Sequence, residues 1–117
     1  MSLRAIRGAI QVEANSAQAI ESGVKELLPA ILQANSIDRD AVISVIMTCT
    51  PDLNAAFPAA FAREIGFGAI PLLCAVEMDV PGALALVIRV LLHAELTQPA
   101  NHVYLRGATV LRKDLAQ

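Results

Sequence analysis

The chain has 117 residues, a formal net charge of -2 and an apolar fraction of 56%. This length suits one domain with a real core, and we expect a single domain over residues 1–117. The slightly acidic balance and the few aromatic residues argue against a nucleic-acid-binding protein. Because a small domain has too little interior for so many apolar residues, we expect the excess to cover the interfaces of a homo-oligomer.

The lack of a recognisable targeting signal and the cysteine spacing predict a protein of a reducing compartment. No uncharged apolar run reaches the length of a membrane span. The N-terminal segment lacks the apolar core and cleavage site of a signal peptide, so we expect a cytoplasmic protein without membrane contact. Cys49 and Cys74 match no metal-binding or redox spacing, and we expect no disulfide between them.

The first half of the chain predicts a strand, a helix and a second strand. Residues 3–12 alternate between two faces, as in a strand with one buried side. Ser16 is a suitable N-cap for a helix to about residue 34, which Pro29 is expected to interrupt and kink. Residues 41–49 are rich in Val and Ile and predict the second strand.

The second half predicts a short helix and three more strands. Pro58 suits the first turn of a helix ending near residue 65. The predicted strands cover residues 70–75, 87–95 and 102–106. Since a helix joins the first two strands, we expect them to lie parallel, as neighbours or near neighbours. The later strands lack a full helix between them, so the order β-α-β-α-β-β, with a further short strand, predicts an α+β domain with a mixed sheet.

One basic residue lies inside an apolar run. Between residues 65 and 92 only Glu77, Asp79 and Arg89 are charged, and Arg89 falls within residues 86–92, which predict a buried strand. A guanidinium keeps its proton, so it needs an anionic or hydrogen-bonding partner. Either Glu77 forms a buried ion pair with Arg89, or both line a pocket for a small anion. The pattern alone favours the ion pair.

Other polar groups on rigid elements could extend such a pocket. Arg7 and Tyr104 lie on predicted strands, and Cys74 lies near the end of another. His93 and His102 stand alone and are expected to have structural or surface roles, and Cys74 has no nearby histidine to activate it as a nucleophile. The chain has no glycine-rich phosphate loop, nucleophile elbow or paired histidines at metal spacing. These residues therefore predict binding and orientation of a ligand rather than hydrolysis.

Eight short blocks of sequence occur in order along nearly the whole chain. The blocks are Arg4–Ala9, Thr50–Leu53, Ala56–Ala59, Arg63–Glu64, Cys74–Val80, Ile88–Val90, His102–Leu105 and Val110–Leu115. No block is specific alone, but together they resemble the AroH-type monofunctional chorismate mutases.

The resemblance implies a fold, an assembly and a reaction. That family forms a homotrimer around a pseudo-barrel core, with a mixed sheet in each subunit and an active site at each subunit boundary. It isomerises chorismate to prephenate in the shikimate pathway, on the route to phenylalanine and tyrosine. The reaction is a unimolecular rearrangement that breaks an ether bond as a carbon–carbon bond forms. The resemblance therefore implies an isomerase that uses no nucleophile, metal or cofactor.

The resemblance also implies a role for each candidate residue. Arg89 would bond the ether oxygen, where negative charge grows in the transition state, and Arg7 with Tyr104 would hold the enolpyruvyl carboxylate. Glu77, helped by Cys74, would bind the ring hydroxyl across a subunit boundary. Arg89, Glu77 and Arg7 are thus the expected catalytic residues. The remaining expected substrate contacts are two ring walls, Phe57 and Leu111, and two entrance cations, Arg63 and Arg112.

Three departures from the family pattern concern substrate affinity and tail closure more than the chemistry. Ala60 stands where many relatives carry a lysine at the pocket mouth, and the loop over residues 65–70 is shorter. Lys113 replaces a common proline.

An alternative function is a non-catalytic trimeric module that binds a small carboxylate and has the shape of YjgF/Rid-type proteins. Glu77 together with Arg89 and Tyr104 argues against this alternative, since a carboxylate sensor has no need of an acid facing its ligand.

Overall fold

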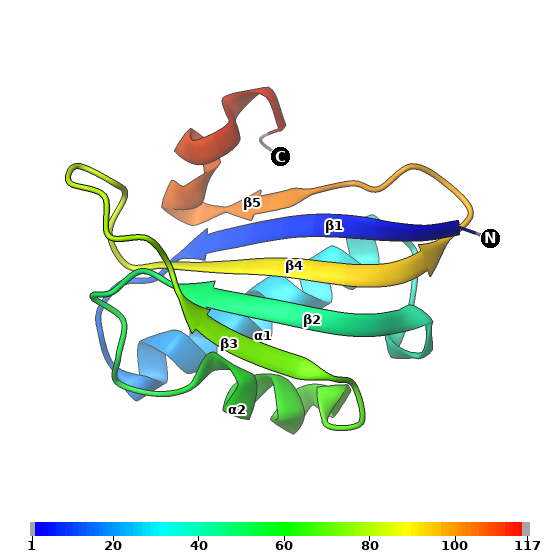
Figure 1. The fold of residues 1–117 in the computed structure, drawn as a ribbon, viewed down its shortest axis with the longest axis horizontal. Helices are drawn as coiled ribbons and strands as arrows, with labels where there is room; N and C mark the ends of the chain where they lie inside the picture. The colour runs from blue at the N-terminus through cyan, green and yellow to red at the C-terminus, as the bar shows by residue number, and fades with distance from the viewer. Residues whose placement is uncertain (1, 116–117) are drawn as a thin grey trace.

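A computed structural model describes residues 2–115 of the chain, with side chains through Arg112. Figure 1 shows one sheet with helix α1 behind it. The elements in chain order are β1 Ser2–Gln11, α1 Ala17–Ala34, η1 Arg39–Ala41, β2 Val42–Cys49, α2 Pro58–Ala62, η2 Arg63–Phe67, β3 Leu72–Val76, β4 Val87–Leu96, β5 Val103–Leu105 and η3 Arg106–Leu115. The predicted α+β class and five strands are confirmed.

The five strands form one mixed sheet in the order β3-β2-β4-β1-β5. The central strand, β4, runs antiparallel to both β1 and β2, while β3 is parallel to β2 and β5 is parallel to β1. The strands β1 and β2 are therefore parallel to each other with β4 between them, so the prediction of parallel near neighbours is confirmed. Each of the two helix-joined strands is extended outward by a short edge strand.

The core lies between one face of the sheet and helix α1. The side chains of Ile6 and Ile10 on β1 are completely buried, and so are Ile20, Leu27 and other apolar residues of α1. A methyl group at Gly8 would lie 2.6 Å from Ile31 Cδ1, so the close approach of α1 to β1 requires glycine there. Each buried aliphatic side chain contributes about 1.5–3 kcal/mol of transfer free energy. Helices α1 and α2 thus cover one face of the sheet, while η3 packs against one end of the opposite face.

Helix α1 begins and ends as predicted, but its proline does not interrupt it. The Ser16 hydroxyl oxygen accepts a hydrogen bond from the Ala19 backbone N–H at 3.1 Å, which confirms the N-cap. The helix runs without a break through Pro29 to Ala34, so the expected interruption is wrong. Pro29 is exposed. Burial of the opposite side of this long helix outweighs the loss of one backbone donor.

Several element ends differ from the predicted ones. The second helix ends at Ala62 and continues as the η2 turn, in which Gly66 adopts a φ of 98°. The strand β5 is confined to three residues, and residues 106–115 form the 3-10 helix η3. Over residues 2–115, no helix is both long and apolar enough to cross a membrane.

Candidate active site

Four predicted site residues line one hollow on the face of the sheet opposite α1. Strand register brings them together, because Arg89 on β4 lies opposite Thr48 on β2 and Ala9 on β1, and Ala9 lies opposite Tyr104 on β5. The small Ala9 side chain leaves space between Arg89 and Tyr104. The resulting hollow, here called the arginine hollow, has a volume of about 270 Å³ and is lined by Arg7, Gly8, Ala9, Ile46, Thr48, Glu77, Arg89, Val90, Leu91 and Tyr104.

Arg89 lies on a strand, as predicted, but its side chain is not buried in the single chain. The neighbouring Ile88, Val90 and Leu92 are buried, whereas the Arg89 side chain keeps 45% of its surface exposed. In the single chain the predicted buried strand is therefore buried on one face. Only one face of β4 lies under α1, and the sequence could not show this because the opposite face carries apolar residues such as Leu91 as well.

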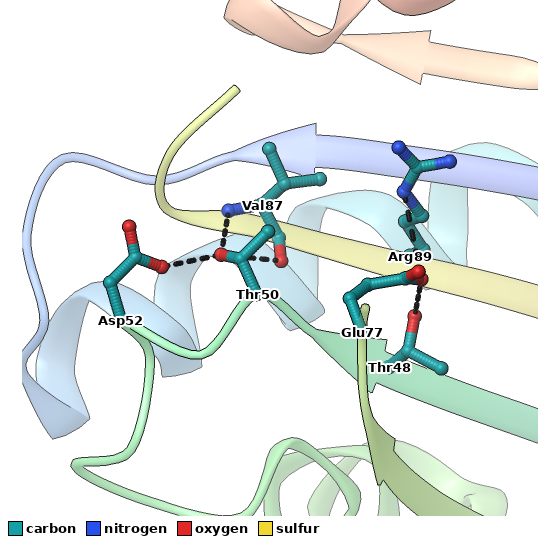
Figure 2. A network of polar contacts seen from close by, with 6 residues as sticks. All are labelled: Thr48, Thr50, Asp52, Glu77, Val87 and Arg89. Atoms are coloured by element: carbon teal, nitrogen blue, oxygen red, sulfur yellow. Dashed lines mark hydrogen bonds and ion pairs between the residues drawn. The ribbon is translucent and has the colours of Figure 1, made fainter. Parts of the chain in front are cut away.

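Glu77 lies beside Arg89 within the same chain, as Figure 2 shows. Its Oε2 atom is 3.6 Å from the Arg89 Nε atom and accepts a hydrogen bond of 2.5 Å from the Thr48 hydroxyl. The Glu77 backbone N–H also donates to the Cys49 carbonyl at 2.8 Å, which fixes the chain just after β3. Glu77 and Arg89 of one chain thus form an ion pair, and both line the arginine hollow.

Thr48 is a functional candidate that the sequence reasoning missed. Its hydroxyl donates to the Glu77 oxygen that faces Arg89, so it holds the carboxylate in place. The available signal was that Thr48 is one of two hydroxyl residues, with Ser44, inside the mostly apolar run that forms β2. A threonine in a strand is too common for this signal to carry a prediction without the pairing of β2 with β4.

The arginine hollow collects hydrogen-bond donors that have no acceptor of their own. The 3.6 Å separation from Glu77 exceeds the usual hydrogen-bond distance, so Arg89 forms an ion pair there and keeps its terminal amino groups available. In the part of the chain that the structure describes, the Arg7 guanidinium and the Tyr104 hydroxyl form no hydrogen bond. Tyr104 is only 5% exposed. Two guanidinium groups and the hydroxyl of a buried tyrosine line the same hollow, which favours an anionic ligand.

Comparison with known proteins agrees with this site. The sequence profile of the family described as chorismate mutase type I matches residues 3–115. The chain belongs to this family. It is 48% identical to the chorismate mutase AroH of Thermus thermophilus, over 97% of this chain and 96% of that protein. It is 39% identical to the chorismate mutase AroH of Bacillus subtilis strain 168, over 99% and 94% of the two chains.

A solved structure supports the same relationship. The chorismate mutase from Clostridium thermocellum superposes with a TM-score of 0.89 at 43% sequence identity, covering 92% of this chain and 98% of that one. The resemblance found in the eight sequence blocks is thereby confirmed. The arginine hollow is thus the candidate active site of this chorismate mutase.

Two predicted contacts of the mutase lie in a different hollow of the same chain. Phe57 and Cys74 line a hollow of about 520 Å³ between the loop before α2 and the end of β3, here called the β3 hollow. Phe57 is 74% exposed. A single chain therefore brings Glu77 and Arg89 together but does not bring Cys74 and Phe57 into the arginine hollow.

The two cysteines of the mutase are free and have different surroundings. Cys49 is buried, and burial, followed by the nearby Cys74 and Asp52, raises the pKa of its thiol to about 12. A thiol with this pKa stays protonated and unreactive at neutral pH. Among the described residues, no three His, Cys, Asp or Glu side chains gather closely enough to hold a metal ion.

Among the remaining predicted residues, Leu111 lies near Tyr104 of the arginine hollow, whereas Arg63 lines neither hollow. Leu111 on η3 packs against the small cluster that contains Tyr104 and Ala9. Arg112 is partly buried and lies close enough to His102 to influence its charge. Arg63 is exposed where α2 passes into η2 and lines neither hollow. Ala60 is partly buried on α2, and the Lys113 side chain lies outside the described part of the chain.

The start of β4 is fixed by a second polar network, visible in Figure 2. The Thr50 hydroxyl accepts from the Val87 backbone N–H at 3.0 Å and donates to Asp52 Oδ1 at 2.5 Å. The Asp52 carboxylate accepts from the Leu86 backbone N–H at 3.0 and 3.2 Å. Leu86 has a φ of 58°, a conformation that non-glycine residues adopt only when their surroundings hold them there. The Thr-Pro-Asp turn thus sets the position of Arg89, three residues further along.

Proposed function

We propose that this chorismate mutase rearranges chorismate to prephenate in the arginine hollow, at sites shared between the subunits of a cytoplasmic homotrimer. The observation that carries the proposal is the convergence of Arg7, Arg89 and Tyr104 donors with the Glu77 acceptor in one hollow. Two arginines against one glutamate give this lining a net positive charge, which suits a substrate with two carboxylates. Family membership decides against the non-catalytic carboxylate-binding module as an alternative.

The first contribution of the site is orientation. Chorismate is floppy about its ether linkage, and only a compact shape allows the new carbon–carbon bond to form. Arg7 and Tyr104 lie on adjacent strands and would hold the enolpyruvyl carboxylate between them. Glu77 would accept a hydrogen bond from the ring hydroxyl, since Thr48 occupies its Oε2 atom and leaves Oε1 available. Holding both ends of the substrate removes much of the entropy cost of reaching the reactive shape.

The second contribution is electrostatic and belongs to Arg89. Negative charge develops on the ether oxygen as its bond to the ring breaks, so a fixed cation there stabilises the transition state more than the ground state. Glu77 faces the Nε side of the guanidinium, and the terminal amino groups remain for the ether oxygen and a carboxylate. No proton transfer and no covalent intermediate is needed, because atoms only exchange bonds within one molecule.

The proposed trimer accounts for apolar surface that a single chain leaves exposed. Phe57, Leu73, Val76 and Met78 on or near the β3 edge are each more than half exposed. Such a patch is typical of a subunit interface. We place the β3 hollow of one subunit against the arginine hollow of its neighbour. Phe57 and Leu111 would then wall the ring, with Cys74 near the ring hydroxyl and with Arg63 and Arg112 adding positive charge at the entrance.

Subunit mixing tests the shared site. Arg89→Ala disables the arginine hollow and Phe57→Asp places a carboxylate in the opposing wall, so each variant trimer alone is expected to be nearly inactive. In trimers assembled from equal amounts of both, each site draws its two halves independently, and about a quarter of the sites should be intact. Chorismate consumption, measured in EDTA without nucleotide, should therefore recover to about a quarter of the wild-type rate.

Two outcomes would contradict the proposal. Mixed trimers that stay as inactive as the single variants would mean that both residues act within one subunit. Wild-type protein that fails to consume chorismate under the same conditions would refute the cofactor-free reaction in this hollow. Native mass measurement of every sample serves as the control, because it shows whether Phe57→Asp still assembles.

A further inference from the structure

His102 contacts the backbone of Arg7 at the point where strand pairing begins. The strand β5 pairs with β1 from Val103, which lies opposite Gly8. One residue earlier, the His102 Nδ1 atom accepts a hydrogen bond of 2.9 Å from the Arg7 backbone N–H. An imidazole nitrogen therefore takes the place that a carbonyl oxygen would have if β5 were longer. The bond fixes the backbone that carries one of the two guanidinium groups of the arginine hollow.

The segment before His102 is held as firmly as the strand after it. Asn35, which ends helix α1 and is only 9% exposed, accepts from the Asn101 backbone N–H at 2.7 Å. The Asn35 amide nitrogen donates to the Asn101 carbonyl at 3.0 Å, and the Asn101 side chain donates to the Ala34 carbonyl at 3.0 Å. His102 thus lies between a fixed asparagine pair and a paired strand, and its ring has little freedom to move.

We propose that neutral His102 is a positioning residue, which aims Arg7 at the substrate carboxylate and makes the reaction sensitive to acid. This inference rests on the proposed role of Arg7 in the arginine hollow. The Nδ1 atom accepts a hydrogen bond only when it carries no proton, so the ring must be neutral with its hydrogen on Nε2. Protonation would turn this acceptor into a donor facing another donor, and the Arg7 backbone would lose its partner.

The surroundings of His102 favour the neutral ring. Partial burial, and then the positive charges of Arg7 on β1 and Arg112 on η3, lower the pKa of His102 from its ordinary value of 6.5. Among the described side chains, Arg7 and Arg112 are charged groups that act on the ring from neighbouring elements. The bond to Arg7 is therefore intact at neutral pH and is lost as the pH falls through this lowered pKa.

Asparagine separates the acceptor role from the titration. The Oδ1 atom of Asn is attached to Cγ, as is Nδ1 of His, so His102→Asn can keep an acceptor at this position and cannot be protonated. His102→Ala removes the acceptor. The wild-type kcat/KM for chorismate should fall on the acid side of neutrality, because kcat/KM reports groups of the free enzyme. His102→Asn should keep most of the neutral-pH activity and lose this acid decline, whereas His102→Ala should lose about three- to tenfold relative to the wild type at neutral pH and also lack the acid decline.

The experiment measures kcat/KM from about pH 5 to pH 8 for the wild type, both His102 variants and His93→Asn. His93→Asn removes the other histidine, which contacts Ser44 instead of Arg7, and should keep the acid decline. The protection of the Arg7 amide against hydrogen exchange, measured by NMR without substrate and corrected for the intrinsic exchange rate at each pH, should be lower in His102→Ala and in wild type at low pH.

An acid decline that persists unchanged in His102→Asn would overturn the proposal, as would wild-type Arg7 amide exchange in His102→Ala. If His102→Ala fails to fold, the pH profile of kcat/KM for His102→Asn still tests whether His102 causes the acid decline. Wild-type protein without any turnover of chorismate would refute the proposed function instead, and the Arg7 exchange rates would still test the hydrogen bond from His102.

Discussion

Arg89→Ala is expected to lower kcat for chorismate by at least about 10²–10³-fold, the scale for losing one preorganised donor to a developing anion. Arg89 is fixed by the Glu77 ion pair and by the pinned start of β4, so its charge costs no reorganisation when the ether bond breaks. Since the interaction strengthens in the transition state, the fall in kcat should exceed the rise in KM. Steady-state kinetics with chorismate measures both.

Two control variants separate charge from geometry at Arg89. Arg89→Lys keeps the charge but loses the planar fork of donors, so it should retain more activity than alanine and less than the wild type. Arg39→Ala removes an exposed arginine that donates to the Ile65 carbonyl at 2.9 Å and does not line the arginine hollow. It should leave kcat unchanged. A loss in Arg89→Ala confined to substrate affinity would contradict the assigned role.

Glu77→Ala is expected to lower kcat/KM by about 10²-fold. The change removes a charge-assisted hydrogen bond to the ring hydroxyl, worth about 1.5–3 kcal/mol, and it also removes the only ion-pair partner of Arg89 among the described residues. Unlike Arg89→Ala, this variant should show a large rise in KM, because the hydroxyl contact exists in the ground state as well. The same steady-state assay gives the ratio.

The matched variants for Glu77 are Glu77→Gln and Glu26→Ala. Glutamine retains an acceptor for the Thr48 hydroxyl and for the substrate, so its loss should be about tenfold smaller than that of alanine. Glu26 also pairs with an arginine, at 2.7 Å from Arg106, but on the helix side of the sheet, and its removal should leave turnover unchanged. If Glu77→Ala matched the wild type, Glu77 would be no more than a structural partner of Arg89.

Local patterns predicted the elements well because they depend on nearby residues. The alternation of residues 3–12 and the Ser16 cap are written in a few positions each, and both are confirmed. Sequence spacing could not show that β4 lies between β1 and β2, since that order depends on long-range pairing. The expected break at Pro29 was wrong for a related reason, because tertiary burial of α1 outweighs a local helix breaker.

The candidate site was predicted in its residues but not in its grouping. The sequence pattern singled out Arg7, Glu77, Arg89 and Tyr104, the resemblance gave them roles, and strand register brought all four to one hollow. The sequence could not show that Arg89 is partly exposed in the single chain, because an apolar strand with one polar residue can be covered on one face or on both. Thr48 and His102 could be recognised only from the fold, because strand pairing places Glu77 beside the Thr48 hydroxyl and the Arg7 backbone N–H beside the His102 ring.

The central claim is that the Arg89 guanidinium serves a ligand in addition to its own glutamate. A crystal structure of the protein with a bicyclic dicarboxylate that mimics the transition state tests this claim most directly. The account predicts the Arg89 terminal amino groups within hydrogen-bond distance of the ether oxygen of the ligand, with Arg7 on a carboxylate and the β3 hollow of a neighbouring subunit closing over the ring. A ligand bound elsewhere, with Arg89 contacting only Glu77, would contradict it.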